Sequence, residues 1–366
     1  MADSPISWPQ VDADVRVAET PPAWMYTDPR VHAQTLERAF IPSWQWVGDD
    51  VGLETDGSQV PLRLLAGSCD EPLLLTRHRG ELQCLSNVCT HRALELVSAP
   101  RCAKVVHCRY HGRRFELDGR LQNAPGFAEA VNFPREADHL QRFPLERVAP
   151  WLFTSLAPER EFAAVWEPVR QRLGHLPLET ARLDPSRTRE WTLEAHWALY
   201  LENYLEGLHI PFLHPGLNAT LDFGRYDYEL FEGGVLQLGE AAAGEPSFGD
   251  LPDGHPDAGR SIAAWYFALF PNLLINAYPW GISLNQLLPL GPTRTRVRFL
   301  SYVWDPSALG GGASGDLDRV EREDESAVEA VQRGLRARAY GRGRYAPHHE
   351  QGTHHLHRWW LERLAR

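Results

Sequence analysis

The stretch CTH at residues 89–91, followed by CRYH at residues 108–111, decides the fold of the first third of this chain. Each motif carries one cysteine and one histidine, and the sixteen residues 92–107 separate them. Glycine and turn-forming residues follow the second motif, at 112 and 117–120, which predicts a hairpin whose backbone N–H groups approach the bound atoms. Two thiolates and two imidazoles on paired short loops are a metal-ligand set.

This ligand set is typical of a Rieske [2Fe–2S] cluster, in which two cysteines hold one iron and two histidines hold the other. Neutral imidazoles leave the cluster less negative than four thiolates would, which raises its reduction potential. A structural zinc site uses the same residue types, but zinc fingers usually pair cysteine with cysteine and histidine with histidine. The mixed pairs favour the cluster, with Cys89, His91, Cys108 and His111 as its ligands.

Composition limits the class of protein and its partners. The 366 residues, 43% of them hydrophobic, allow one large or two modest domains with a buried core. A net charge of −11 argues against nucleic acid or an anionic membrane as the partner, and no apolar run is long enough to span a bilayer. The start of the chain resembles no secretory signal, and three of its five cysteines remain beyond the two ligands. We expect a cytoplasmic protein.

The chain changes character twice, which predicts three segments. Residues 1–41 form an N-terminal helical segment that packs on the catalytic domain. Residues 42–156 contain short alternating apolar runs with turn residues between them, which indicates a small antiparallel β domain that holds both cluster motifs. Residues 157–366 contain helices at 161–173, 191–210 and 316–338, with candidate strands between 226 and 304. The fold class is α+β with antiparallel sheets.

A second metal site is predicted in NYLEGLHIPFLH, residues 203–214. His209 and His214 would lie about 140° apart on an ideal helix, too divergent to share one ion. Pro211 lies between them and predicts a break in the helix that swings His214 towards His209. The alternative is two unrelated histidines, one of which caps a helix end.

A third ligand is predicted in the helix 316–338. Non-haem Fe(II) oxygenases use two histidines and one carboxylate, which leaves positions open for O2 and substrate. Asp324 falls on the apolar stripe of this helix, whereas three glutamates, at 321, 325 and 329, fall off it. A carboxylate that faces a core is costly unless a charge compensates it, so Asp324 is the candidate, with a buried arginine partner as the alternative.

With both metal sites identified, the chain resembles the catalytic α-subunit of Rieske non-haem iron oxygenases over nearly its whole length. The resemblance rests on the cluster motifs, on NYLE-x-x-H-x4-H, and on the late segment from Glu323-Asp324 to Leu335. It implies a Rieske domain followed by a helix-grip catalytic domain, an antiparallel sheet around a long helix. It also implies a [2Fe–2S] cluster, a mononuclear Fe(II) held by His209, His214 and Asp324, and O2 as co-substrate.

The resemblance further implies a homotrimer in which Glu206 links the iron site of one subunit to His111 of the next. Most ring-hydroxylating members carry aspartate at the bridge, and glutamate resembles the branch that acts on quaternary ammonium compounds. Ala93 and Arg113 stand where glycine and tryptophan are common in the family. The chain has no nucleotide or flavin motif, so electrons would come from a separate NAD(P)H-dependent reductase, either directly or through a ferredoxin.

The substrate is expected to be a small organic molecule that is hydroxylated or oxidatively demethylated, with aromatic-ring dioxygenation as the alternative. Candidate pocket residues are Asn203, Phe270, Asn276, Tyr278, Trp280 and Asn285. Aromatic residues could cage a trimethylammonium group by cation–π attraction. Two other classes remain open: a Rieske electron carrier without catalytic iron, and a zinc-stabilised binding module. The histidine-rich tail, His348 to His357, is expected on a solvated surface, with metal binding as the alternative.

Overall fold

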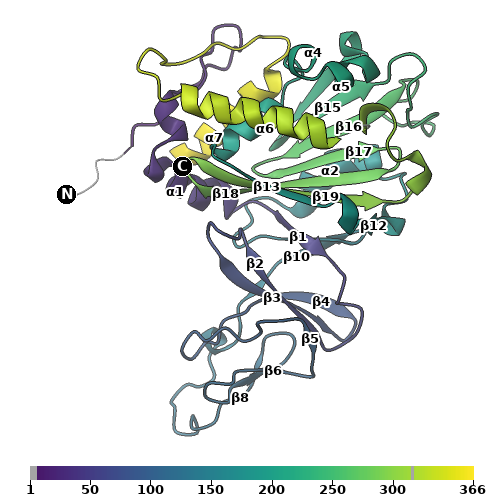
Figure 1. Cartoon of the computed structure of the whole chain (residues 1–366). Helices are drawn as coiled ribbons and strands as arrows, with labels where there is room; N and C mark the ends of the chain where they lie inside the picture. Colours follow the sequence, from purple (N-terminus) through teal and green to yellow (C-terminus); the bar gives the residue numbers. More distant parts are fainter. Residues whose placement is uncertain (1–5, 315–316) are drawn as a thin grey trace. The chain divides into compact units, whose positions relative to one another are not determined.

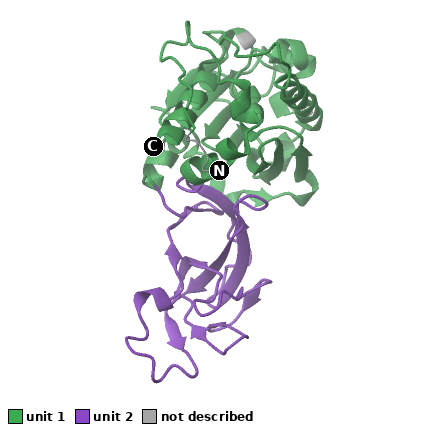
Figure 2. Cartoon of the chain, turned by 90° about the vertical axis from the view of Figure 1, so that its left-hand side faces the viewer, with its two compact units in different colours: residues 1–40, 159–366 green, residues 41–158 purple. Residues whose placement is uncertain are grey.

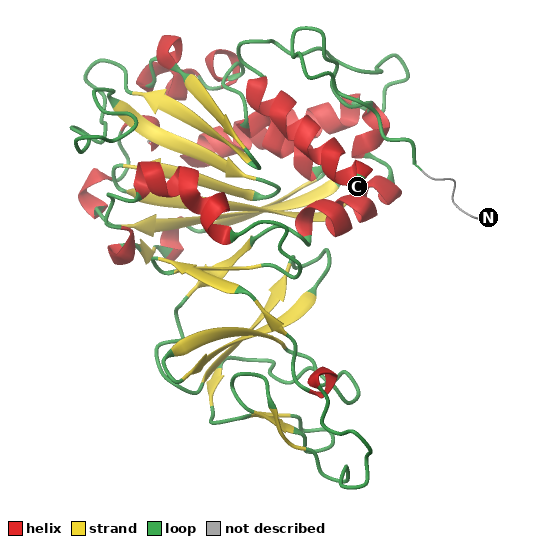
Figure 3. Ribbon diagram, turned by 180° about the vertical axis from the view of Figure 1, so that it is seen from behind, coloured by secondary structure: helices red, strands yellow, loops and turns green. Residues whose placement is uncertain are grey.

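The computed structural model describes residues 6–314 and 317–366, and it divides the chain into two compact units (Figure 2). Unit 2 consists of Ile41–Pro158, and unit 1 of Met1–Phe40 together with Glu159–Arg366. Unit 2 is almost entirely strand and loop, whereas unit 1 mixes helices with a large sheet (Figure 3). The α+β class with antiparallel sheets is confirmed.

Unit 2 contains three small antiparallel sheets, in the orders β1–β11–β10, β5–β2–β3–β4–β9 and β6–β7–β8 (Figure 1). Their strands are β1 (Gln45–Asp49), β2 (Ser58–Leu64), β3 (Glu71–His78), β4 (Glu81–Ser86), β5 (Arg101–Cys102), β6 (Val106–His107), β7 (Arg114–Phe115), β8 (Leu121–Asn123), β9 (Arg142–Phe143), β10 (Leu145–Val148) and β11 (Trp151–Thr154). The two cysteine motifs lie in the loops after β4 and β6, and a small apolar core surrounds their sulfurs.

The two ligand loops share one backbone pattern. In the first, the N–H of Cys89 donates to Leu94 O (2.9 Å) and its carbonyl accepts from the N–H of Ala93 (3.0 Å). In the second, Cys108 makes the matching bonds with Arg113 (2.8 Å) and Gly112 (3.1 Å). The residue four places after each cysteine has a positive φ: +51° at Ala93 and +76° at Gly112. This geometry explains why glycine suits both positions.

Unit 1 is built on one antiparallel sheet of eight strands, in the order β12–β19–β18–β17–β16–β15–β14, with β13 also paired to β19. Its strands are β12 (Arg182–Leu183), β13 (Arg189–Leu193), β14 (Asp227–Phe231), β15 (Gly234–Glu240), β16 (Ile262–Leu269), β17 (Leu273–Tyr278), β18 (Gly281–Gly291) and β19 (Arg294–Val303). Strands β15 to β17 are buried along nearly their whole length, because elements cover both faces.

The helices of unit 1 are α1 (Pro29–Thr35), α2 (Phe162–Leu173), α3 (Trp197–Tyr204), α4 (Ile210–Leu213), α5 (Pro215–Thr220), α6 (Leu317–Gly334) and α7 (Gln351–Ala365). Helix α6 crosses one face of the sheet (Figure 1). The predicted start of this helix, Asp316, lies outside the described residues. Among the described residues, no helix combines the length and the apolar character needed to cross a bilayer.

The helix predicted over 191–210 is wrong at its start. Residues 189–193 form β13, which pairs with β19 from Arg189↔Phe299 to Leu193↔Thr295. Trp191 and Thr192 favour strands, and pairing with β19 provides their backbone partners. Helix α3 begins at Trp197, where the side chain of His196 accepts from the N–H of Ala198 (3.2 Å).

The prediction of a solvated histidine tail is also wrong for the part that forms α7. His357 is fully buried, and its ring nitrogens lie 2.7 Å from the Tyr345 hydroxyl and 2.9 Å from a carboxylate oxygen of Glu202 on α3. His354 is buried as well, with Nε2 2.7 Å from the carbonyl of Asp12. These histidines join the two ends of the chain to α3, which the tail's polar composition concealed.

The positive φ of Ala93, in the loop that carries Cys89 and His91, predicts an effect on stability. A residue other than glycine in the left-handed region costs about 1–2 kcal/mol, so Ala93→Gly should raise the free energy of unfolding by about 1 kcal/mol, after the entropy cost of glycine. Denaturant unfolding of the loaded protein, followed by the visible absorbance of the cluster, measures this. Ala103→Gly is the control, since Ala103 lacks a positive φ and should lose stability. Destabilisation by both changes would contradict the strain.

Candidate functional site

In the predicted metal-site segment, residues 203–214, the helix is interrupted earlier than Pro211 predicted. Helix α3 ends at Tyr204, and α4 resumes only at Ile210, so the break covers Leu205–His209. Pro211 occupies the second position of α4, where its missing N–H costs no helical hydrogen bond. The break therefore comes from the turn before α4, and a second change of direction at His214 separates α4 from α5 (Pro215–Thr220).

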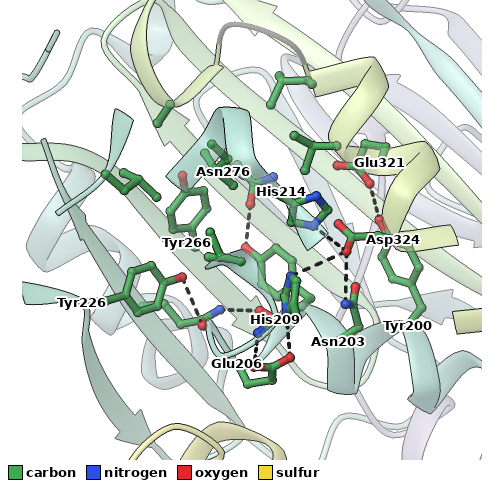
Figure 4. Close-up of a pocket in the computed structure, with 18 of the residues that line it drawn as sticks. Tyr200, Asn203, Glu206, His209, His214, Tyr226, Tyr266, Asn276, Glu321 and Asp324 are labelled. Carbon is green, nitrogen blue, oxygen red and sulfur yellow. Dashed lines mark hydrogen bonds and ion pairs between the residues drawn. The ribbon is translucent and has the colours of Figure 1, made fainter. Parts of the chain in front are cut away.

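The break brings the two predicted histidines together with the predicted carboxylate. The ring centroids of His209 and His214 are 5.1 Å apart. Oδ1 of Asp324 lies 2.8 Å from Nε2 of His214 and 3.6 Å from Nε2 of His209 (Figure 4). One ligand atom from each residue lies within 4.8 Å of the other two, a spacing that one ion can bridge. Two imidazoles and one carboxylate match the facial set of non-haem Fe(II) enzymes.

Carboxylates orient both imidazoles through the ring nitrogens that face away from this point. Nδ1 of His209 lies 2.6 Å from Oε1 of Glu206, and Nδ1 of His214 lies 2.8 Å from Oε2 of Glu323. Such bonds fix the tautomer and leave each Nε2 free to bind a metal. Asn203 donates to Asp324 Oδ1 at 3.1 Å, which fixes the third ligand. Glu323 was not predicted, and only its place beside Asp324 could have indicated it.

The electrostatics of the site favour a bound cation. Burial alone would lower the pKa of His214, but its hydrogen bonds to Asp324 and Glu323 outweigh burial and raise that pKa. Excess negative charge therefore stabilises a positive charge at this point, as a divalent ion would supply. The donor set and its surroundings fit Fe(II).

The prediction that Asp324 faces inward on α6 and Glu321 does not is wrong for Glu321. Its carboxylate lies in the cavity beside the three ligands and accepts a hydrogen bond from the hydroxyl of Tyr200 (2.6 Å). Burial, and then the charge of Asp324, raise the pKa of Glu321 to about 8. Glu321 precedes Asp324 by three residues, so one helical turn brings both to the same side.

The cavity at the three ligands encloses about 80 Å³ (Figure 4). Five tyrosines line it: Tyr200, Tyr204, Tyr226, Tyr266 and Tyr278. Among the described residues, its walls carry the carboxylates of Glu206, Glu321 and Asp324 but no lysine or arginine. The cavity is therefore aromatic and negative.

Half of the predicted pocket residues line this cavity. Asn203, Asn276 and Tyr278 do, and Asn276 accepts from the hydroxyl of Tyr204 at 2.6 Å. The other three do not line it: Phe270 packs against Trp359 on α7, Trp280 stacks on Tyr278 from the buried side, and Asn285 accepts from the hydroxyl of Ser283. Strand pattern alone does not show which face of a fully buried sheet meets the cavity, since both faces are apolar.

The four cluster residues lie together in unit 2 as two pairs. Cys89 and Cys108 are buried, and the rings of His91 and His111 meet with centroids 4.6 Å apart. Within the described residues, the only three or more metal-binding side chains whose ligand atoms lie within 4.8 Å of one another are His209, His214 and Asp324. The two thiols of Cys89 and Cys108 lie near each other and the two imidazoles meet, which is the pairing that a two-iron cluster needs.

Two observations test whether a cluster fits between these pairs. Nδ1 of His91 is buried without a hydrogen-bond partner, and a metal ion would satisfy it. Burial raises the pKa of the Cys89 thiol, so a thiolate there requires compensating positive charge. Both fit a two-iron cluster held between the sulfur pair and the imidazole pair.

Comparison with known proteins gives two family matches and a set of relatives. Residues 43–144 match the Rieske [2Fe–2S] domain, and residues 179–366 match the catalytic domain of the ring-hydroxylating alpha subunit. The chain is 33% identical to choline monooxygenase of Arabidopsis thaliana over 364 residues, covering 93% of this chain and 82% of that protein. It is 29% identical to the carnitine monooxygenase oxygenase subunit of Escherichia coli over 344 residues, covering 91% and 88%.

Solved structures share the fold. A quaternary ammonium Rieske monooxygenase, CntA, superimposes with a TM-score of 0.75 at 22% identity, over 98% of this chain and 99% of that one. Naphthalene 1,2-dioxygenase from Rhodococcus superimposes with a TM-score of 0.69 at 17% identity, over 94% of each.

Removing one histidine should separate the two sites. Loaded protein should contain about three irons to two sulfides, and His209→Ala should lower this to about two to two, with the visible and EPR spectra of the cluster retained. Metal and acid-labile sulfide analysis measures it. The control is His175→Ala, whose ring packs against His255 and Trp265 outside the cavity. Loss of the cluster spectrum in His209→Ala would mean that the sites are misassigned.

Proposed function

The chain belongs to the Rieske non-haem iron oxygenases, and on that basis we propose that it hydroxylates an aliphatic C–H bond of a quaternary ammonium compound. The family predicted from the two motifs is confirmed, with its [2Fe–2S] cluster, its mononuclear Fe(II) and O2 as co-substrate. The protein is therefore the terminal component of an oxygenase, supplied with electrons by a separate reductase. The electron-carrier and zinc-module alternatives are set aside.

The observation that carries this proposal is the tyrosine-lined, negatively charged cavity at His209, His214 and Asp324. A quaternary ammonium group has no N–H to donate, so aromatic faces and nearby carboxylates are the groups that can attract it. An apolar aromatic substrate would gain nothing from carboxylates that it must desolvate. Relatives named for choline and carnitine support the same substrate class, as does glutamate at position 206.

The proposed roles follow from the contacts. His209, His214 and Asp324 hold the iron, Glu206 and Glu323 orient the two imidazoles, and Asn203 fixes the aspartate. Bound iron supplies the activation of O2. The tyrosines hold the substrate's C–H bonds towards the metal and exclude water from the reacting carbon.

The proposed reaction consumes O2, two electrons and two protons. One oxygen atom enters a C–H bond and the other leaves as water. If the attacked carbon is an N-methyl group, the hydroxymethyl product breaks its C–N bond and releases formaldehyde, a tertiary amine and a proton. If it is a methylene carbon bonded to the nitrogen, the same cleavage releases a larger aldehyde, a tertiary amine and a proton. If the carbon is not bonded to nitrogen, the product is an alcohol or an aldehyde hydrate.

Glu206 is the proposed electron bridge, in a homotrimer where it meets His111 of the neighbouring subunit. Its carboxylate bonds to the His209 ring and accepts from the N–H groups of Leu208 and His209, so it touches an iron ligand directly. His111 is exposed on unit 2 and is accessible to another chain. We also propose a reducing, cytoplasmic setting, which suits a chain with an odd number of cysteines beyond the two cluster ligands.

A single-turnover experiment tests the substrate class without the natural reductase. Protein reduced with dithionite and then desalted is mixed with O2 and one of choline, L-carnitine or naphthalene. We expect at least one trimethylammonium compound to accelerate cluster oxidation, seen as recovery of its visible absorbance, and to yield a hydroxylated product or formaldehyde. Acceleration and product with naphthalene alone would overturn the proposal in favour of ring dioxygenation.

Glu206→Gln tests the bridge, with Glu323→Gln as its matched control. Both changes weaken a carboxylate that orients an iron-site imidazole, and such outer-shell losses cost about 10- to 100-fold. Only Glu206 is proposed to carry the electron, so Glu206→Gln should slow substrate-triggered cluster oxidation well beyond Glu323→Gln, with iron content retained in both. Equal slowing would reduce Glu206 to an orienting residue.

A further inference from the structure

A second cavity adjoins the tyrosine-lined one, and the two share Asn276, Leu317 and Glu321. It encloses about 310 Å³ between the start of α6 and the inner face of β13, β17, β18 and β19. We call it the arginine cavity, because Arg187 and Arg189 line it together with four serines, Ser186, Ser283, Ser301 and Ser314. Asp318 and Glu321 also line it, so its walls carry both signs of charge, whereas the described walls of the tyrosine-lined cavity carry no arginine or lysine.

The two arginines differ in their partners. Arg189 already has a carboxylate partner, because it forms an ion pair with Asp318 at 3.2 Å. Arg187 forms no ion pair with a carboxylate of the described residues, and its Nε is buried without a hydrogen-bond partner. Its guanidinium lies over the ring of Trp280, 5.4 Å from the centroid, which holds it in place. The nearby Asp184 interacts with Arg187 only through its charge, and its Oδ1 accepts from the N–H (3.0 Å) and hydroxyl (2.7 Å) of Ser186.

A guanidinium that is fixed by stacking, lacks a carboxylate and is surrounded by hydroxyls is suited to a planar anion. Arginine binds carboxylates through two parallel N–H donors, and serine hydroxyls can satisfy the remaining lone pairs. Because Asn276, Leu317 and Glu321 line both cavities, the arginine cavity lies directly beside the tyrosine-lined one.

We propose that the arginine cavity is the anion subsite of the substrate pocket, so that the substrate is a betaine whose trimethylammonium group lies among the tyrosines and whose carboxylate binds Arg187. This inference rests on the proposed function and narrows it, because an amino alcohol without a carboxylate would leave Arg187 unpartnered. The carboxylate orients the molecule, and the ammonium end then faces His209, His214 and Asp324.

Calorimetric binding to the iron-loaded, resting protein tests the subsite without turnover. The probes are γ-butyrobetaine, which carries a carboxylate, and choline, which does not. Charge-assisted hydrogen bonds contribute about 1.5–3 kcal/mol. Arg187→Gln should therefore raise the Kd of γ-butyrobetaine by about 10- to 100-fold and leave the Kd of choline unchanged. Arg182→Gln is the control, because it removes an exposed positive charge from the same segment, outside the cavity.

The outcomes separate the subsite from the proposed function. If choline binds and Arg187→Gln does not change the affinity for γ-butyrobetaine, the subsite is overturned and the proposed function stands. If neither probe binds the wild-type protein, the proposed function falls with it. An equal loss in Arg182→Gln would attribute the effect to overall charge and would also overturn the subsite. Retained choline binding reports that Arg187→Gln is folded.

A second inference rests on Arg113 in unit 2. Arg113 is only 2% exposed, and its Nη1 donates to the hydroxyl of Thr90 at 3.0 Å. Its guanidinium lies 4.5 Å from the ring centroid of Phe127 and 5.3 Å from that of Phe133, while its Nε is buried without a partner. A buried positive charge therefore lies among aromatic rings, and no carboxylate of the described residues pairs with it.

This charge is close to the cluster ligands. Thr90 stands between Cys89 and His91, and the ring of Phe127 meets His91 edge-on at 5.3 Å. Asp138 interacts with Arg113 only through its charge, and its carboxylate accepts from the N–H (2.8 Å) and Nε (3.1 Å) of Arg135. A fixed positive charge that is shielded from water stabilises an added electron more than an exposed one does.

We infer that Arg113 is a positioning residue whose charge raises the reduction potential of the cluster. Arg113→Gln should shift the midpoint potential downwards, so that the ratio of reduced to oxidised cluster at a fixed potential falls severalfold. Spectroelectrochemical titration of the full-length protein measures the shift. Arg92→Gln is the matched control, because the charge of Arg92 also interacts with His91. Arg92 is exposed to solvent, so its removal should shift the midpoint potential less.

Arg113→Lys keeps the charge and should restore most of the potential. An unchanged midpoint in Arg113→Gln, or a shift no larger than that of Arg92→Gln, would overturn the inference. Iron and sulfide content verify that each variant retains its cluster. If Arg113→Gln fails to assemble the cluster, the midpoint potential of Arg113→Lys is compared with those of the wild type and of Arg92→Gln. A midpoint potential of Arg113→Lys well below that of Arg92→Gln would overturn the inference, because the charge would then have been retained without its effect.

Discussion

Three carboxylates converge on two imidazoles at the end of α3, and this concentration of negative charge is the constraint on which unit 1 depends. Glu206 and Glu323 hold the outer nitrogens of the rings, while Asp324 lies between the inner ones. Like charges this close repel unless a cation lies among them. A cation therefore stabilises the arrangement. The proposed Fe(II) would lie between Asp324 and the inner ring nitrogens, while Glu206 and Glu323 hold the rings through the outer nitrogens.

The fold meets this constraint by interrupting a helix instead of extending it. A continuous helix would turn His209 and His214 away from each other, whereas the irregular turn after Tyr204 allows both to face α6. Helix α7 packs against that turn. Gly352 approaches the carbonyl oxygen of Leu205 so closely that a Cβ atom on residue 352 would lie 2.6 Å from it. The buried His357 binds Glu202 one turn earlier. The histidine-rich tail therefore serves packing.

Local chemistry predicted the ligands, and long-range pairing explains what was missed. The cysteine–histidine motifs and the H-x4-H segment are each contained in a few residues, so spacing alone indicated them. The tyrosines of the cavity come from α3, from the segment before β14, and from β16 and β17, and only the strand order brings them together. Glu321 faces inward because the cavity is wider than the apolar stripe of α6. Residues 191–193 form a strand because β19 pairs with them.

The charge of the site also explains how it can accept a cationic substrate beside a cationic metal. A divalent ion surrounded by Glu206, Glu323 and Asp324 leaves the group with net negative charge, so the ion does not repel an ammonium group that lies a few ångströms away. Glu321 adds an adjustable contribution, because burial and Asp324 raise its pKa to about 8. An arriving cation favours its ionised form. A cationic substrate is therefore attracted by carboxylates whose charge exceeds that of the metal, whereas a neutral molecule of the same size gains nothing from them.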